Sequence, residues 1–272
     1  MSESIKIKDL QAVMARLRDP KAGCPWDVEQ NFKSIAPYTI EEAYEVADAI
    51  ERGDMHDLKD ELGDLLFQII FLSHLAHEQN LFDFDAVTEH VTAKMIARHP
   101  HVFGDRDDIK NTSQVNELWD EVKANEGKKS GYLLDEVTRA LPALLRAQKL
   151  QKKAAKVGFD WPSTDEVFAK IEEEKNELHG AIKSGDLTEI EDELGDLLFC
   201  MVNLARKLGV DAEQALTKTN IKFYNRFNII EDEIKVKSKD FSDYNLEELD
   251  ALWTIAKERL RKNKPPASAL CA

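Results

Sequence analysis

The strongest constraint on the fold is a heptapeptide that occurs twice. Glu-Leu-Gly-Asp-Leu-Leu-Phe occupies residues 61–67 and returns 132 residues later at 193–199. In each copy an acidic pair begins an apolar run, and a second acidic pair lies upstream. The first set of acids is Glu42, Glu45, Glu61 and Asp64, and the second set is Glu174, Glu177, Glu193 and Asp196. This repetition predicts two copies of one structural unit.

The repeat extends beyond the heptapeptide. The other matching pairs are Trp26 and Trp161, Lys94 and Lys222, Arg98 and Arg226, Trp119 and Trp253, and Lys123 and Lys257. Their spacings differ by a few residues, which indicates insertions in loops. We therefore predict an N-terminal repeat over residues 1–125, a linker over 126–136, a C-terminal repeat over 137–262 and a disordered tail over 263–272.

Apolar residues recur at helical spacing, and no segment shows the two-residue alternation of a strand, which predicts an all-α fold. The expected helices span residues 5–19, 40–52, 56–80, 84–98, 113–124, 141–156, 163–184, 188–208 and 211–237, with a last helix that contains Trp253. Residues 23–27 are expected to form a turn. Thr39 with Glu42, and Ser163 with Glu166, have the spacing of capping boxes that begin helices.

Charge and composition exclude several classes of function. The net charge of −15 argues against nonspecific nucleic-acid binding, which needs a basic surface. The most apolar run, residues 65–76, is too short for a membrane span, which needs about 20 residues. The three cysteines show no CxxC pairing and the first residues lack an apolar segment, so we expect a cytoplasmic protein without membrane association.

The acids lie where a solvated face would not put them. At about 100° per residue, Glu61, Glu174 and Glu193 fall within the apolar stripes of their helices. A buried carboxylate is costly unless it is paired or bound to a metal. Oxygen donors without His or Cys favour Mg²⁺, with Mn²⁺ as a substitute, over zinc. Acid-rich helices are commonly solvated faces, and a capping box would explain Glu42 without a metal, but it does not explain the other acids.

Basic and aromatic residues suggest how an anionic substrate would bind. Lys222 and Arg226 are one helical turn apart, so they share a face and could bind a polyphosphate beside a metal, or merely pair with surface acids. Trp253 could stack on a base or fill core. The sequence has no glycine-rich phosphate loop and no ExxH motif, which argues against P-loop and di-iron sites.

Taken together, these motifs resemble the MazG family of nucleoside triphosphate pyrophosphohydrolases over roughly residues 5–262. The motifs are EExxE at 41–45 and 173–177, ExxD at 61–64 and 193–196, and the segments 23–27, 98–103 and 157–161. One position departs from the family pattern, because Glu189 stands where such proteins can carry a lysine.

The resemblance implies a fold in which each unit contributes to a four-helix bundle that dimerisation completes, so a homodimer is expected. It implies Mg²⁺-dependent hydrolysis of diverse NTPs and dNTPs to monophosphates and pyrophosphate, as nucleotide-pool housekeeping. The implied metal ligands are Glu174, Glu177, Glu193 and Asp196. The implied substrate-binding residues are Lys170, Glu174, Lys222, Arg226 and Trp253.

Under the same resemblance, Glu173 or Glu174 would be the general base. The second repeat is the one expected to be active. For the first repeat, which contains four acids, Lys94 and Arg98, three alternatives stay open: it is active, it only binds, or it is structural. The alternative function is therefore a noncatalytic helical module that binds a nucleotide or a protein, at least for the first repeat.

Overall fold

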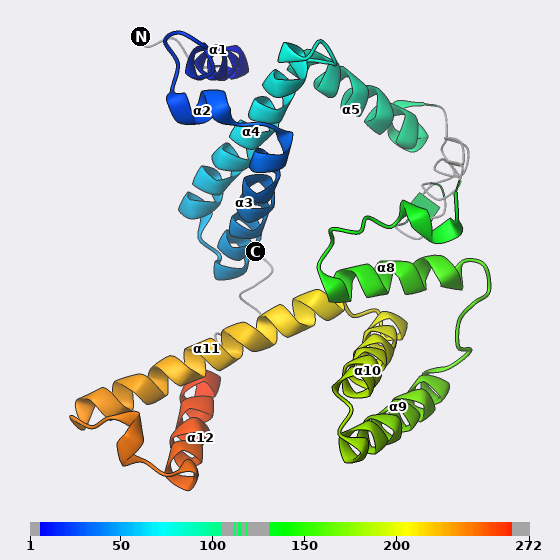
Figure 1. Ribbon diagram of the computed structural model, residues 1–272, viewed down its shortest axis with the longest axis vertical. Coiled ribbons are helices and arrows are strands. Elements are labelled where there is room, and N and C mark those ends of the chain that lie inside the picture. Colours follow the sequence, from blue (N-terminus) through cyan, green and yellow to red (C-terminus); the bar gives the residue numbers. More distant parts are fainter. Residues whose placement is uncertain (1–5, 105–110, 112–113, 116–117, 119–130, 263–272) are drawn as a thin grey trace. The chain divides into compact units, whose positions relative to one another are not determined.

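The computed structural model describes residues 6–104, 111, 114–115, 118 and 131–262. Helices make up most of this part of the chain and it contains no strand, which confirms the predicted all-α class (Figure 1). The chain divides into two compact units, Met1–Lys128 and Lys129–Ala272. Among the helices of the described residues, none is both long enough and apolar enough to cross a membrane.

The first unit is organised around a pair of long helices. Its helices are α1 (Ile7–Leu17), α2 (Pro25–Glu29), α3 (Phe32–Arg52), α4 (Met55–Glu78), α5 (Phe84–Arg98) and α6 (Pro100–Phe103). Helices α3 and α4 pack against each other as a hairpin, and α1 packs on α4. The core between them is Met14, Ile35, Ile70, Phe71 and Leu75.

The second unit repeats this hairpin. Its elements are η1 (Leu133–Glu136), α8 (Ala143–Ala155), α9 (Thr164–Ser184), α10 (Leu187–Lys207), α11 (Ala212–Val236), η2 (Phe241–Asp243) and α12 (Leu246–Lys262). Helices α9 and α10 form the hairpin, and α8 packs on α10. Helices α11 and α12 pack together around Ile230, Ile234, Leu252 and Ala256.

The two hairpins turn by the same local chemistry. Gly53 ends α3 with φ of 70° and Gly185 ends α9 with φ of 76°, a left-handed conformation that glycine adopts without a side-chain penalty. The next residue, Asp54 or Asp186, accepts hydrogen bonds from backbone N–H groups of the following helix. So short a turn makes the two long helices antiparallel neighbours, and this places their acids opposite each other.

The predicted start of α3 is wrong. The helix begins at Phe32, because the Asn31 side chain accepts hydrogen bonds from the backbone N–H groups of Lys33 and Ser34. Thr39 therefore lies inside the helix, where its hydroxyl donates to the carbonyl of Ile35 at 3.3 Å. No capping box exists at Glu42, so helix capping does not explain this acid.

Most other predicted helices agree with the structure to within roughly two residues at each end. Ser163 caps α9, accepting from the N–H of Glu166, but without the reciprocal Glu166 bond that would complete the predicted capping box. Part of the predicted turn at 23–27 is instead the short helix α2. The helix expected over 113–124 lies largely outside the described residues, and the tail lies wholly outside them. Of the linker predicted over 126–136, residues 131–136 are described, and Leu133–Glu136 form the short helix η1.

Candidate metal centre

In the second unit, three glutamates converge between the hairpin helices. Glu174 and Glu177 are one turn apart on α9, and Glu193 faces them from α10. One carboxylate oxygen from each lies within 4.8 Å of the others. The hairpin thus gathers three acids from two helices into one group.

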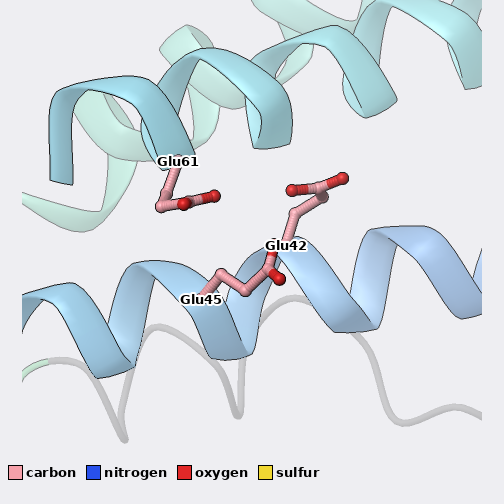
Figure 2. A group of neighbouring side chains, drawn as sticks. All are labelled: Glu42, Glu45 and Glu61. Carbon is pink, nitrogen blue, oxygen red and sulfur yellow. The ribbon is translucent and has the colours of Figure 1, made fainter. Parts of the chain in front are cut away.

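The first unit contains the same arrangement. Glu42 and Glu45 on α3 lie opposite Glu61 on α4, again with oxygens within 4.8 Å of one another. Figure 2 shows the three side chains directed into the space between the two helices. Because these residues are 132 positions from their counterparts in the second unit, the repeated sequence produces a repeated site.

Glu174 is the most deeply buried of these acids, with 4% of its surface exposed. Its Oε1 is 2.6 Å from Nζ of Lys170, which is also 2.8 Å from Oε1 of Glu173. Its Oε2 is buried and has no hydrogen-bond partner. A buried carboxylate oxygen without a partner is costly, and a cation beside it would remove that cost.

The pKa values reflect the crowding of acids. Burial, followed by the charges of Glu174 and Glu193, raises the pKa of Glu177. Burial, followed by the charge of Glu45, raises the pKa of Glu61. Two carboxyl groups in one site disfavour each other's ionised form, and a bound cation reverses this. An all-oxygen donor set of this kind fits a hard divalent cation such as Mg²⁺.

The fourth predicted ligand is not part of either group. Asp196 is exposed and lies outside the cluster of Glu174, Glu177 and Glu193. Its counterpart Asp64 is also exposed and outside. Burial first, and then the charge of Asp64, raises the pKa of Glu42, so this acid acts on the group electrostatically.

Three of the predicted substrate residues belong to helices α11 and α12. The guanidinium of Arg226 lies 5.3 Å from the ring centre of Trp253, a cation–π contact. Trp253 also packs against Phe223, at 5.2 Å between ring centres, and against the core of the α11–α12 pair. Trp253 is thus partly buried against this core, and its ring contacts Arg226. Lys222 lies one turn before Arg226 on α11. The grouped glutamates belong to α9 and α10, so these three residues come from different helices than the glutamates.

The two glutamate groups differ in the side chains that accompany them. The residue 132 positions before Lys170 is Tyr38, so no lysine stands at this place in the first unit. There, Nε2 of Gln68 donates to Oε1 of Glu42 at 3.4 Å, where the second unit has Cys200. A position-by-position comparison of the two copies would have revealed this difference from the sequence. Of the predicted first-unit partners, Trp119 and Lys123 lie outside the described residues, and Lys94 and Arg98 are half-buried on α5.

Comparison with known proteins identifies relatives along nearly the whole chain. The family model described as the MazG nucleotide pyrophosphohydrolase domain matches residues 30–103 and 163–229, and each segment contains one glutamate group. A nucleoside triphosphate pyrophosphohydrolase of Escherichia coli K12 is 45% identical over 260 residues, covering 93% of this chain and 98% of that protein.

A Thermotoga maritima protein named nucleoside triphosphate pyrophosphohydrolase/pyrophosphatase MazG is 41% identical over 254 residues, covering 93% of this chain and 96% of the relative. The crystal structure of a mazG-related protein from Thermotoga maritima is 24% identical and covers 43% of this chain and 98% of that one, with a TM-score of 0.37.

Proposed function

The chain belongs to the MazG nucleotide pyrophosphohydrolase family, and from this premise we propose that it hydrolyses nucleoside triphosphates to monophosphates and pyrophosphate. The observation that carries the proposal is the group of Glu174, Glu177 and Glu193, in which a buried Glu174 oxygen has no partner. A divalent cation would offset the charge of this group beyond what Lys170 supplies, and a divalent cation is also what the phosphates of the substrate require.

Glu174, Glu177 and Glu193 would hold Mg²⁺, with Mn²⁺ as a substitute, and Asp196 is one turn from Glu193 for an additional contact. When bound, the metal neutralises phosphate charge and orients the attacking water. The reaction forms a bond from the water oxygen to the α-phosphorus and breaks the bond from that phosphorus to the oxygen that bridges to the β-phosphorus. Pyrophosphate leaves, and the proton from water passes to a carboxylate.

Glu173 is the better candidate for that carboxylate. Glu174 belongs to the converging group, whereas Glu173 lies outside it and more than half of its side chain is exposed. Lys170 binds both acids, so it fixes Glu173 relative to Glu174. Substrate binding by Lys170 itself would require it to leave this pair, and its present contacts favour a positioning role.

Lys222 and Arg226 would bind the phosphates and Trp253 the nucleotide. The positive charges of Lys222 and Arg226 would offset the repulsion between a polyanionic substrate and a chain of net charge −15. We also propose a homodimer, because the hairpin helices expose apolar residues that a monomer would leave in water, including Ile182, Leu194 and Leu198. A broad specificity for NTPs and dNTPs, and a role in housekeeping of the cytoplasmic nucleotide pool, complete the proposal.

A different role is proposed for the first unit. Tyr38 stands where the second unit has Lys170, so Glu42 lacks a lysine at this place and receives a long hydrogen bond from a neutral amide instead. We infer that this unit is a noncatalytic helical module that binds nucleotide or protein, while the second unit performs the chemistry.

The proposed function is tested by supplying the full-length protein with a panel of NTPs and dNTPs in the presence of Mg²⁺ and separating the products by anion-exchange chromatography. Attack at the α-phosphorus gives NMP and pyrophosphate from several substrates. Release of NDP and inorganic phosphate would contradict the proposal, because it requires attack at the γ-phosphorus.

A further inference from the structure

The second unit contains a cavity that the proposed reaction does not use. It has a volume of about 560 Å³ and lies between α8, the segment joining α8 to α9, and α10. Its walls include the aromatic side chains of Phe159, Trp161 and Phe199, and Phe159 is 79% exposed. Exposed aromatic residues around a concave, largely apolar site are typical of a place that takes a ligand.

The first unit fills the corresponding position with its own side chains. Phe71 on α4 is buried and packs in one core cluster with Met14, the buried residue of α1. Residue 203, at the same register of the repeated helix, is an asparagine, and the buried residue of α8 is Gln151. Asn203 thus stands where the first unit has the ring of Phe71, and each of the helices α1 and α8 buries one residue, Met14 in the first unit and Gln151 in the second. An aromatic ring of the first copy is therefore missing where the cavity lies.

These amides are costly for a protein core. Gln151 is 7% exposed and Asn203 is 2% exposed. Gln151 donates from Nε2 to the carbonyl of Phe199 at 2.8 Å, and Asn203 accepts from Arg206 at 2.7 Å. Oε1 of Gln151 and Nε of Arg206 have no partner. Polar atoms left unpaired beside a cavity are expected where a ligand supplies the missing hydrogen bonds.

The ion pairs near the cavity argue against a phosphate as the recognised group. Arg206 and Lys207 are both paired with Asp160, which also lines the cavity. A phosphate would meet this carboxylate and would have to break those pairs. The unpaired donor and acceptor, together with the aromatic walls, instead match the edge and faces of a neutral planar heterocycle.

We propose that this cavity binds a nucleobase or its nucleoside, at a site separate from the grouped glutamates. At about 100° per residue, Phe199, Asn203 and Arg206 lie roughly 80–140° around α10 from Glu193. They face α8, whereas Glu193 faces α9. A ligand in the cavity therefore lies on a different side of α10 from the metal site.

The test is calorimetric titration of the full-length protein with adenosine, guanosine, cytidine, uridine and thymidine in the presence of EDTA. At least one nucleoside binds, with one site per chain. Asn203→Phe, which restores the first-unit residue and occupies the cavity, and Gln151→Met, which removes the unpaired acceptor, each weaken that binding by about tenfold or more, the range expected for leaving a hydrogen-bonding group of the ligand unpaired. If Asn203→Phe fails to fold by circular dichroism, Gln151→Met decides the outcome.

Glu193→Gln separates the two sites and is expected to bind nucleoside as the wild type does. Both cavity variants retain NTP hydrolysis, so a failure here is distinguishable from a failure of the proposed function. Absence of nucleoside binding to the wild type, unchanged binding by both cavity variants, or loss of binding in Glu193→Gln overturns the proposal. If the wild type binds no nucleoside and Asn203→Phe changes the association state, seen as a change of sedimentation coefficient, the cavity takes a side chain of another protein chain instead.

Discussion

Replacing Glu193 by glutamine tests whether the glutamate group is built for a cation, because it predicts opposite effects with and without metal. The substitution keeps the shape of the side chain and removes one charge. At 4.8 Å, the upper limit of the oxygen separations, two carboxylates repel by about 1–3 kcal/mol for effective dielectric constants between water and a protein surface. Glu174 is the buried partner of that repulsion. The metal-free variant is therefore expected to be more stable than the wild type by about that amount.

This gain corresponds to a rise in Tm of roughly 2–4 °C per kcal/mol for the second unit, measured by differential scanning calorimetry in EDTA. In Mg²⁺ the order reverses, since the wild type gains stability from metal binding and the variant gains less. Hydrolysis of NTP is expected to fall by at least about 100-fold, since even residues that only support a metal ligand cost 10–100-fold.

Glu61→Gln is the matched control at the corresponding position of the first unit. It relieves the same crowding, so its metal-free stability also rises, yet hydrolysis changes little. The reasoning is refuted if Glu193→Gln destabilises the metal-free protein, because the carboxylate would then be held by favourable contacts within the chain. A comparable loss of activity in Glu61→Gln would show that both units are catalytic.

Three further predictions concern the surroundings of the site. Lys170→Met removes the cation beside Glu174, so calorimetric titration should show tighter Mg²⁺ binding while kcat falls; weaker Mg²⁺ binding would contradict the role given to Lys170. The raised pKa of Glu177 means that protons compete with metal, so Mg²⁺ affinity should rise with pH above about 4.5. In EDTA the pH dependence of stability has the opposite sign. The contribution of Glu177 to stability is present below its unfolded-state pKa and is lost as pH rises through the higher folded-state pKa. Melting temperatures of wild type and Glu177→Gln, measured as a function of pH, would reveal this loss. Gly185→Ala forces a side chain into a left-handed conformation with no clash, so it should lower stability by about 1 kcal/mol without changing the kcat of the folded enzyme.

Local sequence information was sufficient for the helices and for the position of the acids around them. Helical periodicity placed Glu174 within an apolar stripe, and the structure buries it. It failed at the start of α3, which was expected at residue 40 but lies at Phe32, upstream of Pro37. The Asn31 cap satisfies the first backbone donors earlier in the chain, so the helix continues through the proline at a local cost.

Periodicity was not sufficient to decide which acids converge. Asp196 is three residues after Glu193, which corresponds to a rotation of roughly 60° and a rise of about 4.5 Å along the helix. This displacement places it outside the group, whereas the same spacing keeps Glu174 and Glu177 together because both are on the α9 face that meets Glu193. The pairing of Lys170 with two acids likewise depends on side-chain positions that spacing alone does not specify.

The sequence by itself determined the duplication, the helical class and the chemistry of the acids, because these depend on residue type and on spacing within one helix. The tertiary structure alone decided the membership of the glutamate groups, the contacts that Lys170 and Gln68 make with them, and the cavity beside Asn203. These features depend on distances across packed helices. At one register position the first unit has Phe71, which packs in its core, and the second unit has Asn203, which lines the cavity.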